Sequence, residues 1–508
     1  QGYSSAASVV YKRQLQFILI MKFLRRISMR KKPNIIFILT DDQGAWAMNC
    51  AGNADIKTPN LNYLAESGIR FDNFFCASPV CSPARASILT GCIPSQHGVH
   101  DWIRSGSLDK EKLGDKRNDP YYTNEDKPIQ YLEGLRTYTD ILSENGYTCA
   151  LAGKWHLGDS MTPQHGYSKW FTIGRGGCYY YKADVIENGE IYYENRYITD
   201  VITNKAIEYI EELSSKEEPY YINVNYTAPH DPWDENQHPK EFVDLYRDCE
   251  FNATPNEPIH PNQIHSAPIG IGEERKRLLR GYYAAVSAMD AGIGRILDKL
   301  REKGELENTM IIFSADNGMN MGHHGIWGKG NGTFPMNLYD TAVKVPFIIS
   351  YPKAFEGGKI SFDMASHYDI IHTLVDWLEI DEELSDRLPG RSFKHSLLGE
   401  EAEDQSIIIL DEYGPNRMIR TKEWKYIHRY PYGPHELYHL SEDPGEKNNL
   451  IGQLEYKEIE EKLRSELANW FTKYADPKLD AAKEAVTGCG QLRKAGVYSE
   501  GKMTYYPL

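Results

Sequence analysis

Uninterrupted apolar runs recur along the chain. The first spans residues 34–40 and ends at Asp41, and similar runs occupy residues 220–224, 310–314 and 345–350. Such runs are typical of strands that are buried on both faces of a parallel sheet. Segments with apolar positions at helical spacing separate them, at residues 60–66, 200–213, 273–303 and 369–378. This alternation predicts an α/β fold, with a large mixed, mostly parallel sheet sandwiched by helices.

The pattern changes after about residue 395. Short strand-like runs at residues 406–410, 417–420 and 424–428 are separated by turn residues, and a helical pattern follows at 454–474. We therefore predict a catalytic domain over residues 31–395 and a smaller C-terminal α+β subdomain of antiparallel strands and a helix over residues 396–508. Residues 106–128 are charged and turn-rich, which indicates a surface excursion.

Composition narrows the functional classes. The 508 residues include 57 Lys and Arg against 72 Asp and Glu, so the net charge is −15. This balance argues against nucleic-acid partners. The sequence contains no apolar run of the ~18 residues that a spanning helix needs, so we expect no integral membrane segment. The eight cysteines form no C-x-x-C pair, and buried thiols are the simplest interpretation for all except Cys81.

Residues 1–30 are predicted to be a leader or a non-native segment. An apolar stretch at residues 15–21 lies between basic residues but has no small-residue cleavage site, so the signal for export is unclear. Met21 and Met29 are both plausible starts.

Acidic residues follow two of the predicted strands. Asp41 and Asp42 come after the first strand, and Asp316 and Asn317 come after the strand at 310–314. Ligand sites of open α/β sheets lie beyond the carboxyl ends of strands. Carboxylate and amide oxygens suit a hard cation such as Ca²⁺ or Mg²⁺. For one acidic pair alone, a solvated turn is an equally good interpretation.

Cys81 begins a predicted helix that Gly91 ends. A thiol at a helix N-terminus beside Arg85 is expected to have a depressed pKa, which indicates a reactive cysteine without naming a reaction.

The sequence Cys-Ser-Pro-Ala-Arg at 81–85, followed by Leu-Thr-Gly at 89–91, resembles the signature of type I sulfatases. Further family-like stretches lie at residues 34–43, 153–158, 228–232, 315–329, 436–438 and 443–446, so the resemblance covers about residues 32–450. It implies an alkaline-phosphatase-like fold. It also implies that a formylglycine-generating maturation enzyme oxidises Cys81 to formylglycine, whose hydrate attacks a sulfate ester.

The resemblance also implies the role of each residue. Asp41, Asp42, Asp316 and Asn317 would hold Ca²⁺, with Mg²⁺ as the alternative ion, together with residue 81. Arg85 and Lys154 would stabilise the nucleophile, and His156 would take the proton whose loss expels sulfate. We expect Lys154 and His156 to share one face of an extended segment. His230 and Lys329 would bind the sulfate oxygens, and His230 would protonate the leaving alcohol.

The substrate implied is a sulfated carbohydrate: a glycosaminoglycan, a mucin-type glycan or an algal glycan. The segment 226–265 favours galactose or N-acetylgalactosamine sulfate, cleaved by exo action. Substrate contacts are predicted for His100, Asp101, Trp102, Arg104, His324, His428 and Arg429, the last two closing the pocket from the C-terminal subdomain. Family members of this type work in the periplasm or outside the cell, which is therefore the expected location.

Two alternatives remain open at this point. The same scaffold could hydrolyse a phosphoester or phosphonate, or the chain could bind sulfated glycans without turnover. Position 317 is Asn, an oxygen ligand, which favours one hard cation over the two zinc ions of related phosphatases.

Overall fold

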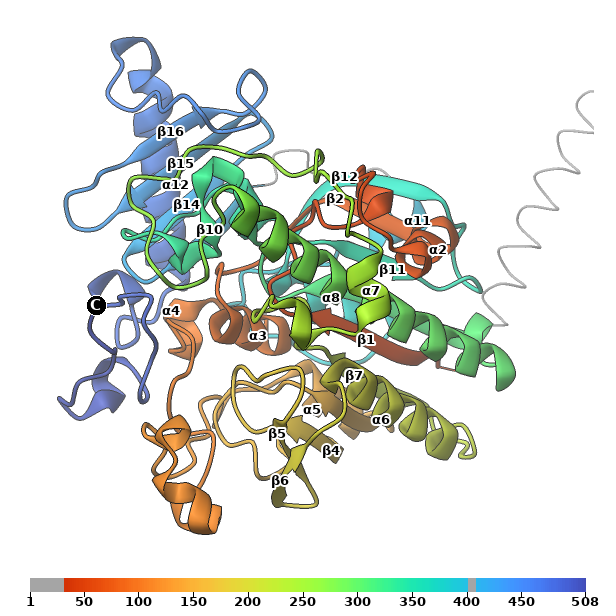
Figure 1. Cartoon of the computed structure of the whole chain (residues 1–508). Coiled ribbons are helices and arrows are strands. Elements are labelled where there is room, and N and C mark those ends of the chain that lie inside the picture. Colours follow the sequence, from red (N-terminus) through yellow and green to blue (C-terminus); the bar gives the residue numbers. More distant parts are fainter. Residues whose placement is uncertain (1–31, 401–407) are drawn as a thin grey trace, which may run out of the picture.

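The computed structural model describes residues 32–400 and 408–508 (Figure 1). The predicted leader at 1–30 and the start of the strand predicted at 406–410 lie outside the described residues. In the part of the chain that is described, no helix combines the length and the apolar character that crossing a bilayer requires.

The main sheet has ten strands in the order β12-β2-β11-β8-β1-β7-β3-β4-β5-β6. The run β8-β1-β7-β3-β4 is parallel, while β11 is antiparallel to both of its neighbours and β5 and β6 form an antiparallel edge. The strands are β1 (Asn34–Thr40), β2 (Ile69–Phe75), β3 (Thr148–Gly153), β4 (Tyr167–Ile173), β5 (Ala183–Glu187), β6 (Glu190–Glu194), β7 (Tyr220–Asn225), β8 (Thr309–Ala315), β11 (Phe347–Ser350) and β12 (Lys359–Ser366).

This arrangement confirms the mixed, mostly parallel sheet. The direction of β11 could not be inferred from its sequence, since this strand is buried on both faces. An apolar run arises from burial, whichever way the strand points.

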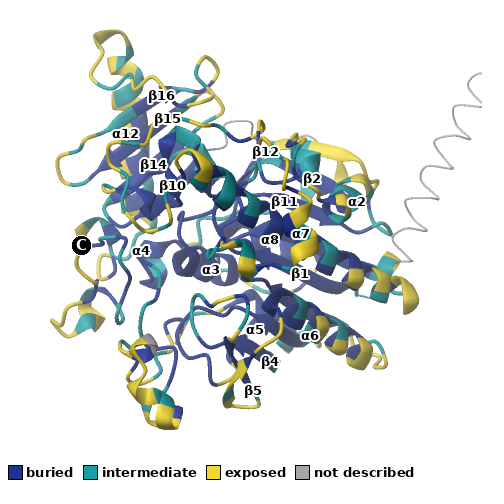
Figure 2. Cartoon of the chain, in the orientation of Figure 1, coloured by how far each residue is buried: buried dark blue, intermediate teal, exposed yellow. Residues whose placement is uncertain are grey.

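Helices cover both faces of the sheet (Figure 1). Ile36 and Ile38 of β1 pack in the core under α2 (Pro59–Ser67), α6 (Ile198–Leu213) and α8 (Glu273–Glu302). Ile35 and Phe37 alternate to the opposite core, under α3 (Cys81–Thr90), α5 (Tyr138–Glu144) and α10 (Ile370–Trp377). Figure 2 shows β1, in the middle of the sheet, and α3 in the buried interior.

Short elements complete this region. They are α4 (Pro94–His97), α7 (Lys240–Asp244), α9 (Asp340–Val343), α11 (Lys394–Leu398) and the two-stranded pair β9 (Asn320–Met321) and β10 (Trp327–Gly328).

A second, antiparallel sheet has the order β13 (Ile409–Tyr413), β14 (Asn416–Arg420), β15 (Trp424–Arg429) and β16 (Glu436–His439). The helix α12 (Lys457–Tyr474) packs on it through Leu463, Leu467 and Phe471. The predicted antiparallel strands and helix are confirmed, and β16 is a strand that the prediction missed. After α12 the chain returns to α4, where the Asp476 amide donates to the Ser95 carbonyl at 2.9 Å (Figure 1).

The eight cysteines all lie among the described residues, and none forms a disulfide.

Candidate active site

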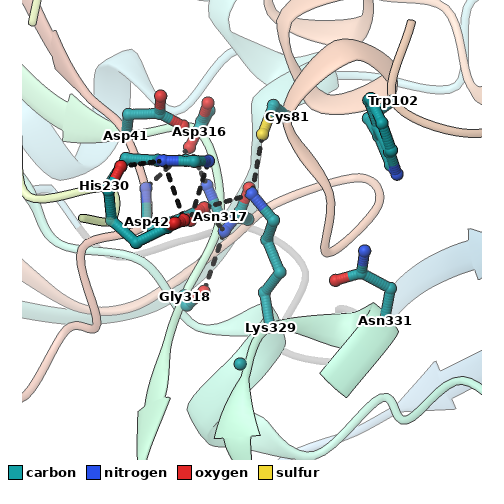
Figure 3. A network of polar contacts seen from close by, with 12 residues as sticks. Asp41, Asp42, Cys81, Trp102, His230, Asp316, Asn317, Gly318, Lys329 and Asn331 are labelled. Carbon is teal, nitrogen blue, oxygen red and sulfur yellow. Dashed lines mark hydrogen bonds and ion pairs between the residues drawn. The ribbon is translucent and has the colours of Figure 1, made fainter. Parts of the chain in front are cut away.

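The acidic residues meet at the carboxyl ends of β1 and β8. Asp41 directly follows β1 and Asp316 directly follows β8, and these two strands pair in parallel up to Thr40 and Ala315. The Asp42 amide donates to Asp316 Oδ1 at 3.2 Å. Asp42 adopts a left-handed backbone with φ 62°, which turns its side chain back to the cluster (Figure 3). The sheet register therefore assembles the carboxylates that the sequence placed after separate strands.

Three cations neutralise the three carboxylates. Lys154 Nζ lies 2.5 Å from Asp41 Oδ2. Arg85 Nη2 lies 2.8 Å from Asp316 Oδ2. Lys329 Nζ donates to Asp42 Oδ1 at 2.6 Å. The formal charge of these six side chains is therefore zero, although all of them are buried.

Two fully buried oxygens of this cluster, Asp41 Oδ1 and Asn317 Oδ1, accept no hydrogen bond from the described residues. Asn317 Nδ2 donates to Asp42 Oδ1 at 2.9 Å and to the Gly318 carbonyl at 2.8 Å, so the amide oxygen faces away from these contacts. Carboxylate oxygens of Asp41, Asp42 and Asp316 lie within 4.8 Å of one another. A buried acceptor without a donor is costly unless a cation binds it. The donor set therefore fits one hard divalent cation.

Cys81 is the first residue of α3 and faces this cluster (Figure 3). Its Sγ lies 2.8 Å from Lys329 Nζ. Burial raises the pKa of the Cys81 thiol to about 12, even though Lys154 and Lys329 act in the opposite direction. The expectation of a depressed pKa was therefore wrong, because loss of hydration outweighs the nearby positive charge. The thiol stays protonated near neutral pH, which makes the unmodified cysteine a poor nucleophile.

His156 has one ring nitrogen fixed and one free. Its Nε2 lies 2.9 Å from the Ile103 carbonyl, which can only accept, so Nε2 carries the proton. The buried Nδ1 has no hydrogen-bond partner in the described part of the chain. Burial and then the charge of Lys154 hold the pKa of His156 well below its usual range, so the ring is neutral. The backbone of His156 is left-handed, with φ 56°, so the predicted extended segment is not what aims this side chain.

His230 approaches from the other side of the cluster. Its Nδ1 donates to the Asp231 carbonyl at 2.8 Å, and its Nε2 lies 3.6 Å from Asp42 Oδ2. The structure thus brings together every residue predicted for the metal and catalytic roles: Asp41, Asp42, Cys81, Arg85, Lys154, His156, His230, Asp316, Asn317 and Lys329.

A cavity of about 1010 Å³ opens above these groups, and Cys81, His156, His230 and Lys329 line it. Trp102 and Arg104, predicted to contact substrate, line it too. So do residues that sequence reasoning missed: Glu125, Arg175, Tyr179, Asn331 and Cys489. Glu125 belongs to the segment predicted as a surface excursion. Its Oε2 accepts from the amides of residues 106, 107 and 108, so part of that segment folds inward.

Two predicted substrate residues are instead held inside the protein. His100 Nδ1 contacts Tyr505 Oη at 2.9 Å and its Nε2 contacts the Pro94 carbonyl at 3.1 Å. Asp101 accepts from the Tyr413 hydroxyl at 2.7 Å and from the Gly490 amide at 3.0 Å. Both side chains are fully buried, so neither is placed to contact a sugar.

The other three predicted contacts also lie away from the cavity lining. His324 stacks on Tyr339 with ring centroids 4.0 Å apart. His428 Nδ1 lies 2.8 Å from the Tyr426 hydroxyl. Arg429 pairs with Glu436 at 2.6 Å. The strands of the second sheet therefore do not close the cavity as expected, and that role falls to the segment after α12, which supplies Gly488 and Cys489.

Comparison with known proteins fits this geometry. The sequence profile of the family described as Sulfatase matches residues 33–380. The chain belongs to the sulfatase family. A second profile, N-sulphoglucosamine sulphohydrolase, C-terminal, matches residues 322–473 of this sulfatase. The alkaline-phosphatase-like fold is thereby confirmed.

Similar proteins support the assignment. An N-acetylglucosamine-6-O-sulfatase of Bacteroides thetaiotaomicron is 28% identical over 544 residues, covering 91% of this chain and 90% of that protein. An ulvan-active sulfatase of Formosa agariphila is 28% identical and covers 88% of this chain and 82% of its own. A solved structure in complex with its substrate, D-glucosamine-2-N,6-O-disulfate, superposes with a TM-score of 0.74 at 25% identity, covering 89% of this chain and 100% of that one.

Proposed function

We propose that this sulfatase removes a sulfate group from a sulfated saccharide and that residue 81 acts after conversion to formylglycine. The observation that carries the proposal is the position of Cys81. It begins a buried helix, lies against Lys329, and faces an oxygen cluster with two unsatisfied acceptors at the base of a large cavity. The named activities of the similar proteins, on N-acetylglucosamine sulfate and on ulvan, support a saccharide as the leaving alcohol.

The hydrated aldehyde would supply two hydroxyl groups on one carbon, one to attack sulfur and one whose deprotonation lets sulfate depart. His156 Nδ1 accepts no hydrogen bond from the described residues, whereas the other ring nitrogen is bound to the Ile103 carbonyl. We assign the proton from the second hydroxyl to this atom. Arg85 and Lys154 hold Asp316 and Asp41 in place and keep positive charge beside residue 81.

His230 and Lys329 would hold the sulfate oxygens. Nε2 of His230 is the nitrogen that faces the cluster, because Nδ1 donates to the Asp231 carbonyl. In its protonated form, His230 would deliver a proton from Nε2 to the leaving alcohol. A sugar alkoxide is a poor leaving group, so this proton transfer lowers the barrier to cleavage.

Asp41, Asp42, Asp316 and Asn317 would hold Ca²⁺, which would supply charge stabilisation to the sulfate oxygens. Since the side chains of the cluster sum to zero charge, a bound divalent ion makes the site net positive. A positive site attracts a singly charged sulfate ester.

Peptide mass spectrometry of the segment that contains Cys81 tests the nucleophile, on protein from a host that contains a maturation enzyme. We expect the mass loss of a thiol converted to an aldehyde at Cys81. An unmodified thiol from a host that converts a control sulfatase would overturn the proposal.

A panel of sulfated monosaccharides tests the substrate class. It should include N-acetylglucosamine 6-sulfate, N-acetylgalactosamine 6-sulfate and galactose 6-sulfate, each with its phosphate counterpart. We expect release of sulfate from at least one sugar and faster turnover of the sulfate than of the phosphate. The reverse preference would favour phosphoester hydrolysis on the same scaffold.

A further inference from the structure

The segment of residues 488–493, which we name the wall segment, borders the catalytic cavity although it lies beyond both family matches. Those matches end at residues 380 and 473. Gly488 and Cys489 nevertheless line the same cavity as Cys81 and Lys329. This part of the active site is therefore built by sequence outside the two matched regions.

A hydrogen-bonded seam fixes the wall segment to the stretch that follows α4. Gln491 is fully buried, and its Oε1 accepts from the His100 amide at 2.8 Å and the Asp101 amide at 3.3 Å. Its backbone amide donates to the Trp102 carbonyl at 2.7 Å, and its carbonyl accepts from the Arg104 amide at 2.8 Å. Asp101 Oδ2 accepts from the Gly490 amide. The buried Asp101 and Gln491 are therefore positioning residues for this wall.

Three cavity-lining side chains end on carbonyls of the wall segment. Trp102 Nε1 and Asn331 Nδ2 both donate to the Gly488 carbonyl at 3.0 Å, and Arg104 Nη1 donates to the Cys489 carbonyl at 3.0 Å. The wall segment therefore determines the positions of these three side chains in the cavity. Figure 3 shows Trp102 and Asn331 on the side of Cys81 and Lys329 that is opposite the acidic cluster.

The geometry leaves specific groups for a ligand. Asn331 donates one amide hydrogen to the Gly488 carbonyl, and no described residue donates to its Oδ1. One side of the Trp102 ring packs on Gly490, where an added Cβ would lie 3.0 Å from the ring and 2.9 Å from Arg104 Cβ. Gly490 also has φ 109°, a backbone conformation that residues with a Cβ atom rarely adopt. An aromatic surface beside a single acceptor oxygen suits a sugar, which presents C–H groups on one face and hydroxyl groups at its edge.

We propose that the wall segment is the specificity element of this sulfatase, placing Trp102 and Asn331 against the saccharide part of the substrate. Trp102 stacks on the sugar face, and Asn331 Oδ1 accepts from a sugar hydroxyl or amide. The inference rests on the proposed function, since it concerns the leaving alcohol of that same reaction. It adds Asn331 to the residues that contact substrate and explains why the buried Asp101 and Gln491 matter to substrate choice.

The test compares a sulfated monosaccharide that the wild type cleaves with 4-methylumbelliferyl sulfate, whose flat leaving group offers no sugar hydroxyl. Two variants address the proposal. Asn331→Ala removes the acceptor, and Gly490→Ala displaces Trp102 and Arg104 without removing any group that contacts substrate. Lys502→Ala, on the same terminal segment but paired with the exposed Glu500, is the matched control. Thermal melts verify that each variant is folded.

For both variants we expect kcat/KM on the saccharide to fall at least about tenfold relative to kcat/KM on the aryl sulfate, which is the loss of one well-placed contact. The control keeps the wild-type ratio. An equal fall on both substrates, or no fall on either, overturns the proposal. If the wild type cleaves aryl sulfates but no sulfated sugar of the panel, the proposed saccharide substrate is wrong. The role of the wall segment is then overturned together with it.

Discussion

Two clusters of charged side chains differ in whether all of their hydrogen-bond acceptors are satisfied. This difference distinguishes a ligand-binding site from a structural cluster. In the active-site cluster, Asp41 Oδ1 and Asn317 Oδ1 accept no hydrogen bond from residues 32–400 or 408–508. In the junction cluster, between α9 and the second sheet, Lys425 Nζ contacts Asp340 Oδ1 at 2.8 Å and Glu446 Oε1 at 2.6 Å. The remaining carboxylate oxygens there accept from Arg420 and from the Asp340 amide.

The junction cluster is therefore complete without a ligand, and the active-site cluster is not. Leaving buried acceptors unpaired costs free energy in the absence of a ligand. Charge alone does not distinguish the two clusters, because each combines carboxylates with Lys and Arg, and in both most of these side chains are buried. Hydrogen-bond satisfaction does, and each of the following changes tests that distinction.

The largest effect is expected at the nucleophile. Cys81→Ala should lower turnover of 4-methylumbelliferyl sulfate by at least about a thousandfold, since it removes the residue proposed to form the covalent intermediate. Steady-state rates measure this loss. The partly exposed Cys249 is not among the residues that line the cavity, and it provides the control Cys249→Ser, which should keep its activity. Residual turnover near the wild-type rate would rule out residue 81 as the nucleophile.

Breaking the junction cluster should cost stability without affecting the ion. Lys425→Met leaves the buried Glu446 without its cation, whereas the partly exposed Asp340 keeps its pair with Arg420. The free energy of unfolding should fall by about 3–5 kcal/mol. Urea denaturation measures this change. Lys494→Ala, which removes an exposed pair with Glu133, should cost less than about 1 kcal/mol. A similar loss in both variants would mean that the junction cluster contributes no more than a surface pair.

A substitution in the active-site cluster should instead weaken binding of the ion. Asn317→Ala removes one of the two unsatisfied oxygens, so calcium affinity should fall at least about tenfold. Titration calorimetry on metal-stripped protein gives the affinity, and Lys425→Met should keep the wild-type value. The exposed Asn448 supplies the control Asn448→Ala. Unchanged calcium binding in Asn317→Ala would remove Asn317 from the ligand set.

The smallest effect concerns Glu125 at the cavity edge. Burial raises the pKa of this carboxyl to about 7, although the amides of residues 106–108 act against the shift. A raised folded pKa means that the folded state holds a proton that the unfolded state releases. The stabilisation is therefore present below the unfolded pKa and is lost as pH rises through the folded pKa.

Between about pH 5 and about pH 8, wild-type stability should thus decline more than that of Glu125→Gln, which keeps an acceptor but cannot titrate. Urea denaturation at several pH values measures the difference. Parallel pH profiles for the two proteins would show that Glu125 does not titrate differently in the folded state.

The acidic residues and the cysteine of the candidate active site could be predicted because each belongs to a local sequence pattern. Asp41 and Asp316 end apolar strands, and Cys81 begins a helix with a distinctive motif. Strand ends are fixed by short-range burial and turn chemistry, so their side chains meet wherever the strands pair. The substrate contacts predicted for His100 and Asp101 are not formed by the structure. Both were placed correctly beside the cavity-lining Trp102, but their polar groups are bound by a segment almost 400 positions later.

The sequence by itself determined the α/β alternation, the two acidic strand ends and the cysteine that faces them. Only the tertiary structure decided the direction of β11, the raised pKa of Cys81 and the cavity wall at Gly488. The physical reason is shared by all three. Strand pairing, desolvation and cavity walls depend on which distant residues pack against a position, whereas strands, helix starts and turn residues depend on neighbours in the chain.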